Sequence, residues 1–183
     1  MSAVQPSSQP FEFAFALDVR GGWADSTALG VGLHFDVGRT FGAFLELSSS
    51  SERRAALGNG FVHWQQSGLS LGGRYRKDWG RWFFEPGVSA GAEILVMRGA
   101  GFNATHSVLG VDSSVCVRVH GGVRVLGPVG VLVGISGCAF PIDTRIGVLG
   151  VEDTFALPRG QVGILAGLFW TSAAVQGSSA PGP

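Results

Sequence analysis

Large apolar side chains alternate with small or polar ones along most of the chain, and this pattern constrains the fold more than any other feature. Between Phe11 and Arg20 every second residue is large and apolar, and the residues between are alanine or charged. Successive side chains of a strand point to opposite faces, so the pattern predicts a strand with one apolar face. It recurs in segments 11–20, 29–37, 41–48, 64–76, 82–96, 114–125, 129–135 and 162–170.

The second face of these predicted strands carries mostly glycine, serine and scattered charges. A soluble barrel turns its bulky apolar face inward and shows a charged face to water. Only 14% of the 183 residues are charged, against ~25% in a typical soluble domain. We therefore predict that the apolar face contacts lipid. We also predict that the sheet closes into a barrel, which pairs the backbone N–H and C=O groups of every strand. The predicted fold class is all-β: an eight-stranded antiparallel up-and-down transmembrane β-barrel.

Composition and charge exclude two other classes of protein. A helical membrane protein is excluded, because no segment offers the ~20 apolar residues that a spanning helix needs. The nearest, residues 125–142, carries Pro128 and Pro141. The formal net charge is zero, which removes the electrostatic case for binding nucleic acid.

The connections between the predicted strands differ in length. Short ones fall at residues 38–40, 78–80 and 126–128, and longer ones at 22–27, 48–62, 98–110 and 141–159. Outer-membrane barrels have short periplasmic turns and longer external loops. We therefore expect both termini in the periplasm. Loops 48–62, 98–110 and 141–159 are the candidates for contact with an external ligand or host surface.

Aromatic residues are expected in two belts at the membrane interfaces. An alternative, that these residues fill a core, predicts no clustering at strand ends. The periplasmic belt would contain Phe11, Phe41, Tyr75, Trp79, Trp82 and Trp170, and the external belt Trp23, Phe61 and Trp64.

These features together resemble the small eight-stranded outer-membrane proteins, the group that contains the OmpA membrane domain and OmpX. The resemblance covers residues 11–170 and includes the aromatic-ended last strand, Gln161 to Trp170. It implies a monomer in the outer membrane of a Gram-negative bacterium, with membrane lipids as partners. The chain departs from many members by continuing past Trp170. We expect residues 1–10 and 171–183 to be disordered, and we note that no secretory signal peptide is present in the sequence.

Charged residues on the inner face are the main candidate site. With eight strands the interior is filled by side chains, so inward charges must pair. We predict a network with Arg74 facing Glu85, if the hairpin turn is Trp79-Gly80. A proton or ion path through the lumen is the alternative. The network comprises Glu46, Glu85, Glu93, Arg74, Arg76, Arg118, His120 and Arg124.

The two cysteines, Cys116 and Cys138, are a candidate disulfide. Each lies eleven residues from Gly127, so a turn centred on that glycine makes them direct partners on neighbouring strands. The oxidising periplasm permits a bridge. Two buried thiols that fill space are the alternative.

Catalytic signatures are absent from the sequence, and we predict neither an enzyme nor a bound cofactor or metal. The best fragment of a catalytic site is His63 with Ser67, which lacks an acid. The expected function is that of a structural anchor, or of a barrel that presents external loops for adhesion or recognition. A narrow pore is the alternative, and a lipid A-modifying enzyme is a remoter one.

Overall fold

The computed structural model describes residues 13–23, 27–101, 107–147 and 154–172, and the side chains of most of them. Disorder was expected for residues 1–10 and 171–183. Residues 1–10 and 173–183 lie outside the described residues, whereas Thr171 is the last residue of a strand, Gly160–Thr171. No helix among the described residues is long and apolar enough to cross a membrane.

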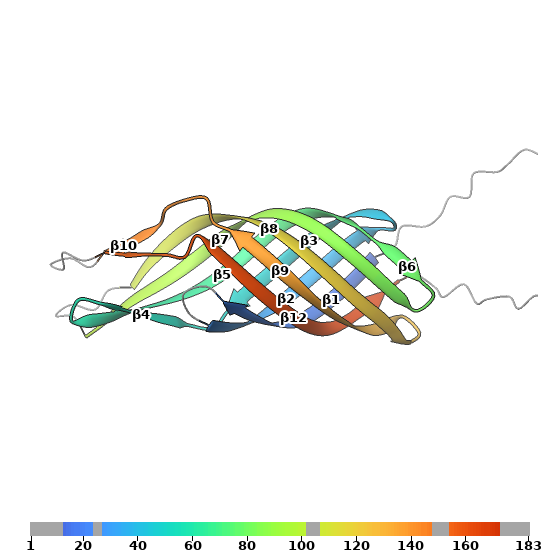
Figure 1. The fold of residues 1–183 in the computed structure, drawn as a ribbon, viewed down its shortest axis with the longest axis horizontal. Helices are drawn as coiled ribbons and strands as arrows, with labels where there is room; N and C mark the ends of the chain where they lie inside the picture. The colour runs from blue at the N-terminus through green and yellow to red at the C-terminus, as the bar shows by residue number, and fades with distance from the viewer. Residues whose placement is uncertain (1–12, 24–26, 102–106, 148–153, 173–183) are drawn as a thin grey trace, which may run out of the picture.

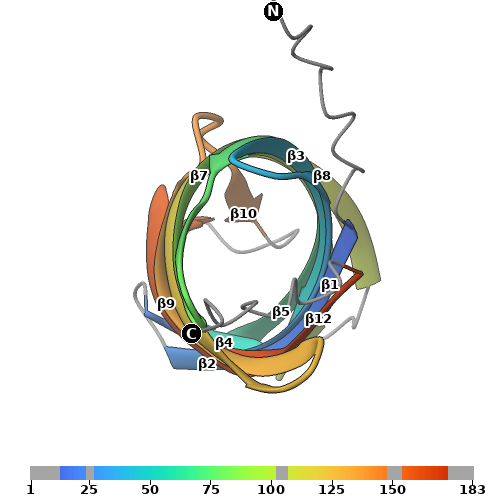
Figure 2. The same ribbon diagram turned by 90° about the vertical axis from the view of Figure 1, so that its right-hand side faces the viewer.

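The described residues form twelve strands, and eight of them close into one ring. The ring order is β5, β3, β2, β1, β12, β9, β8, β7, and β7 pairs with β5. Figure 2 shows this ring from its end. All pairs are antiparallel, and paired ring strands follow one another along the chain except for β1 and β12, which close the ring. The predicted eight-stranded up-and-down barrel is confirmed. The ring strands are β1 (Phe13–Trp23), β2 (Thr27–Gly38), β3 (Phe41–Ser50), β5 (Gly60–Tyr75), β7 (Trp82–Ala100), β8 (Ser107–Leu126), β9 (Val129–Ala139) and β12 (Gly160–Thr171).

The remaining four strands lie at the two ends of the barrel (Figure 1). Strand β4 (Arg53–Leu57) pairs with β5 beyond the end of β3, and β6 (Lys77–Trp79) pairs with β7 beyond the end of β5. Strands β10 (Arg145–Gly147) and β11 (Thr154–Ala156) form a separate two-stranded sheet.

The two faces of the barrel wall have opposite character. Large apolar side chains are exposed on the outer face of every ring strand, for example Leu17, Leu29 and Val131. The inner face buries charged residues such as Asp36 and Arg118. Since alternate residues of a strand point to opposite faces, the period of two in the sequence produces this division.

Glycines on the inner face make room for phenylalanine rings inside the barrel. A Cβ atom at Gly72 would overlap the ring of Phe44, and one at Gly130 would overlap the ring of Phe169. The rings of Phe83 and Phe169 meet edge to face, with centroids 5.0 Å apart. The small residues of the inner face therefore reflect a filled interior.

At one end of the barrel the strands are joined by tight turns. Gly80 and Gly127 have positive φ angles of 62° and 53°, and each is the first central residue of a two-residue hairpin turn, as type II′ turns require. Because Gly80 takes this position, the turn is Gly80-Arg81 and Trp79 pairs with Trp82. The predicted register was wrong by two residues: Arg74 lies opposite Gly87.

At the other end the described residues of two predicted long loops, 48–62 and 98–110, are largely strand. Strand β5 begins at Gly60 and pairs with β4, and strand β7 continues to Ala100 and pairs with β8 as far as Ser107. In segments 48–62 and 98–110 the described residues are mostly strand and extend the barrel as hairpins, whereas in segment 141–159 β10 and β11 form a separate hairpin. The connection expected at 22–27 is also short, because β1 pairs with β2 up to Trp23 and Thr27.

Candidate functional site

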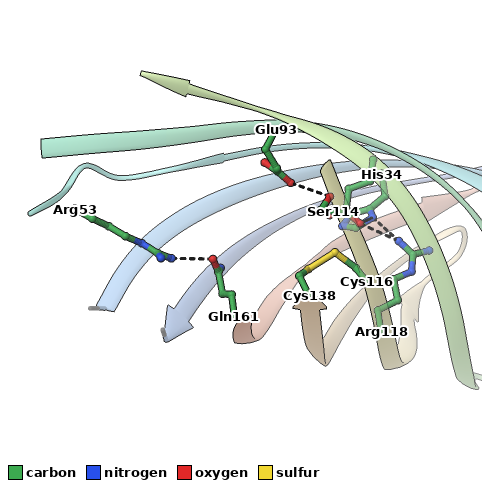
Figure 3. The surroundings of a disulfide bond; sticks show 9 residues. His34, Arg53, Glu93, Ser114, Cys116, Arg118, Cys138 and Gln161 are labelled. Carbon is green, nitrogen blue, oxygen red and sulfur yellow. Dashed lines mark hydrogen bonds and ion pairs between the residues drawn. A yellow bond between two sulfur atoms is a disulfide. The ribbon is translucent and has the colours of Figure 1, made fainter. Parts of the chain in front are cut away.

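Arg118 crosses the lumen and meets side chains from three other strands. It projects from β8, and the strand opposite β8 in the ring is β2. Its Nη1 donates to Nδ1 of His34 on β2, 2.8 Å away (Figure 3). Its Nη2 lies 3.3 Å from Oδ1 of Asp36, also on β2. Glu46 on β3 and Glu85 on β7 each lie 3.3 Å from the guanidinium. One side chain thus ties together opposite walls of the barrel.

Two further arginines extend this set of charges toward the short turns. Arg74 Nε lies 3.1 Å from Asp36 Oδ1 and 3.6 Å from Glu85 Oε2. Its Nη groups also donate to the carbonyl oxygens of Gly38 and Arg39, each at 2.9 Å. Arg76 lies 3.8 Å from Glu85 Oε2. Three arginines and three carboxylates therefore balance one another, as burial of ions requires.

The predicted lumen residues do not all join this central network. Arg124 pairs with Asp78 at 2.9 Å, and Asp78 also contacts Arg76 at 3.3 Å, so Arg124 belongs to the turn end of the lumen. Glu93 accepts a hydrogen bond from Ser114 Oγ at 3.3 Å, farther from the turns.

The ring of His120 packs edge to face on His34, with centroids 5.6 Å apart. Sequence reasoning did not include His34, Asp36 and Asp78 in the network. His34 and Asp36 share the inner-face parity of their strand, so parity was the signal that would have included them.

The structure joins Cys116 and Cys138 in a disulfide across β8 and β9, with Cα atoms 4.1 Å apart (Figure 3). They are direct register partners, as a turn centred on Gly127 predicts. The register arises differently, however. The turn residues are Gly127-Pro128, and the extra residue Val125 forms a β-bulge that restores the pairing of the cysteines.

A cavity of about 80 Å³, lined by both polar and apolar residues, lies beside the Arg118 network, on the side away from the short turns. A space of this size holds several water molecules. Its lining includes Ser48, Ser70, Glu93, Ser114, Ser136 and Gln161, together with the disulfide. Arg53 of β4 reaches across this end of the lumen and donates to Gln161 Oε1 at 2.9 Å.

A hydrophobic cluster closes the barrel beyond this cavity; we call it the mouth cluster. Trp64 is 1% exposed and Leu95 is fully buried, and the ring of Trp64 lies 5.3 Å from that of Phe155 on β11. The expectation that Trp64 belongs to an aromatic belt was wrong, because even-numbered residues of β5 point inward. The members of the mouth cluster are Leu57, Val62, Trp64, Leu95, Ile146 and Leu157.

Most other predicted belt residues project from the outer face. Phe41, Tyr75, Trp79, Trp82 and Trp170 are exposed near the short turns, and Phe61 is exposed at the opposite end. Phe41 and Tyr75 pack together, with ring centroids 5.3 Å apart. Phe11 lies outside the described residues, and so does the side chain of Trp23.

His63 and Ser67 are not brought together. His63 Nδ1 lies 2.7 Å from Glu52 Oε1, and Ser67 Oγ lies 3.1 Å from Ser49 Oγ. Ser67 lies four positions along the extended strand from His63, a distance of about 13 Å. Within the described ranges, no three His, Cys, Asp or Glu side chains converge in a way that would hold a metal ion.

Charges near β10 form a separate, exposed group. Asp143 lies 3.0 Å from Arg159 Nη2 and 3.2 Å from Arg145 Nη2. The hydrogen bond from Arg159 lowers the pKa of the Asp143 carboxyl, and the bond from Arg145 adds to this effect. The carboxylate therefore remains ionised at neutral pH and links the two ends of the β10–β11 segment.

The ring of strands is similar to solved outer-membrane proteins. A major outer membrane protein from Thermus thermophilus covers 89% of this chain and 100% of its own, with a TM-score of 0.61 and 7% identity. Neisserial surface protein A covers 87% and 96%, with a TM-score of 0.51 and 11% identity. Ail of Yersinia pestis, solved with the heparin analogue sucrose octasulfate, covers 88% and 97%, with a TM-score of 0.50 and 8% identity.

No family model and no curated protein sequence matches the chain. At these identities the similarity establishes the fold alone, that of a small outer-membrane β-barrel.

Proposed function

We propose that this chain, which has the fold of small outer-membrane β-barrels, is a closed, non-catalytic barrel in the outer membrane of a Gram-negative bacterium. It acts as a structural anchor, or it presents its surface hairpins for adhesion or recognition. The observation that carries the closed barrel is the contact of Arg118 with His34 and Asp36 on the opposite strand. Three sets of side chains fill the lumen at different depths along the barrel axis: the Arg118 network, the phenylalanine rings described above, and the mouth cluster.

The outer face supports the membrane location. Exposed apolar side chains occupy the outward positions of all eight ring strands. Water would not solvate such a surface, whereas lipid would. The exposed tryptophans at the short-turn end, Trp79, Trp82 and Trp170, are suited to a membrane interface.

The unequal ends of the barrel support one orientation. Both chain ends of the ring lie at the short-turn end, where Ala14 pairs with Thr171. The hairpin extensions β4–β5, β7–β8 and β10–β11 lie at the opposite end (Figure 1). Since outer-membrane barrels place short turns in the periplasm, these extensions would face the cell exterior.

Conductance in planar lipid bilayers tests the closed barrel against the narrow pore. The purified protein is inserted alongside a porin that serves as the positive control. We expect no unitary currents from this chain under conditions in which the porin conducts. Steady, ion-selective unitary currents would overturn the closed barrel and favour the pore.

A further inference from the structure

Three basic side chains form one row across adjacent strands at the end of the barrel away from the short turns. Arg54 of β4 is the register partner of His63 on β5, and His63 is the register partner of Arg98 on β7. The row points outward, because the alternate residues Val62 and Trp64 are buried inside. Arg54 and Arg98 are both exposed. We call these three residues the basic row.

The basic row lies at the rim of the apolar outer face. On the same face as Arg98, the next register pair on the membrane side is Val96 with Leu109, and the one after it is Ile94 with Val111. All four of these side chains are exposed and apolar. A cation one residue pair beyond such a surface would lie at the depth where lipid headgroups begin.

Acidic partners are scarce around this row. Glu52 contacts His63 at 2.7 Å, but among the described residues no carboxylate pairs with Arg54 or Arg98. Arg54 instead stacks on Phe61, with its Cζ 3.5 Å from the ring centroid. Stacking covers one face of the guanidinium and leaves its N–H edge available to oxygen ligands.

The scaffold beneath the row is rigid. The inward neighbours Val62, Trp64 and Leu95 pack in the mouth cluster, so the three residues are held on paired strands rather than on a loop. Two strand spacings place the Arg54 and Arg98 backbones about 10 Å apart. That spacing suits a headgroup that carries more than one phosphate.

We propose that Arg54, His63 and Arg98 bind the phosphate groups of a membrane lipid headgroup, in the leaflet at the end of the barrel opposite the short turns. Arginine is well suited to this role because its planar fork of donors matches phosphate oxygens. The inference rests on the proposed membrane location, and it adds a defined lipid-binding site to it.

The test compares bisphosphorylated lipid A with the same lipid after its phosphates have been removed. Each lipid is added to the detergent-solubilised full chain, and bound lipid is counted by native mass spectrometry. The double variant Arg54→Gln/Arg98→Gln should bind the phosphorylated lipid at least about tenfold more weakly than the original chain, since two charge-assisted contacts are lost. The control Lys77→Gln/Arg81→Gln, at the opposite end, should bind it unchanged.

Equal binding of the two lipids, or equal binding by the double variant and the control, would overturn the inference. It would also be overturned if sucrose octasulfate bound as tightly as lipid A and lost affinity in the same double variant, because the row would then be a site for soluble polyanions. Every protein is first shown to insert into phosphatidylcholine vesicles. Failure of that step would contradict the proposed function, whereas an inserted barrel without phosphate-dependent binding contradicts only the site.

Discussion

Arg118 of β8 contacts side chains of β2, β3 and β7 inside the barrel. Burial of an ion pair costs desolvation energy that the attraction between the charges only partly offsets, so the network as a whole contributes little net stability. Removal of one member is different, because the partners remain buried and lose their countercharge. In this barrel, loss of Arg118 would remove one cationic contact from each of Asp36, Glu46 and Glu85. Arg74 would remain beside Asp36 and Glu85, and Arg76 beside Glu85.

Replacement of Arg118 by Met should therefore lower the free energy of unfolding by about 3–5 kcal/mol. The measurement is a urea titration of the barrel in lipid vesicles. Arg145→Met, at an exposed arginine beside Asp143, is the matched control and should change the value by less than about 0.5 kcal/mol. Equal effects of the two substitutions would mean that the lumen is wet and that Arg118 is solvated.

At the scale of strands, the alternation in the sequence predicted all eight members of the ring, because one side chain in two must face lipid along the whole wall. The strand ends were less predictable. Near Trp64 and Val62 both faces carry apolar or aromatic residues, so composition does not distinguish the mouth cluster from an interfacial belt, and only the parity of β5 does. Similarly, segment 78–81 permits a hairpin turn at either Trp79-Gly80 or Gly80-Arg81. The positive φ angle of Gly80 selects the second.

The disulfide stabilises the pairing of β8 with β9. It joins residues 22 positions apart, and closing a loop of this size contributes about 3 kcal/mol by restricting the unfolded chain. Cys116→Ser/Cys138→Ser should lower the unfolding free energy by this amount, and a reducing agent should have the same effect on the original chain. Alkylation of both cysteines in protein unfolded without a reductant would rule out the bridge.

The molecule is a barrel whose strands are joined by short turns at one end and extended by hairpins at the other. Strands stop at short turns near Gly80 and Gly127 at one end, whereas β4 and β10 extend the other end (Figure 1). The mouth cluster lies at this extended end. The apolar outer face lies between these two ends. This asymmetry predicts one orientation in the membrane, with the larger hairpins outside the cell and the short turns in the periplasm.

An epitope inserted between Gly58 and Asn59, in the β4–β5 turn, should be labelled by antibody on intact cells. The same epitope inserted between Gly80 and Arg81 should be labelled only after the outer membrane is permeabilised. Each turn lies in a hairpin that tolerates inserted residues, because its backbone is on the surface. The reverse labelling pattern would invert the proposed topology.

The β-bulge in β8 gives the β8–β9 hairpin one spare residue. Leu126 pairs with Val129 and Arg124 pairs with Gly130, so Val125 has no partner of its own. Deletion of Val125 should therefore leave every other pair intact, including the cysteines. Deletion of Val131 from β9 would instead shift Cys138 by one position and turn its side chain toward lipid, because the spare residue lies on β8 and cannot replace a residue lost from β9. Oxidised, folded protein from the first deletion and none from the second is the expected result, so tolerance of chain shortening in this hairpin should be confined to the bulge.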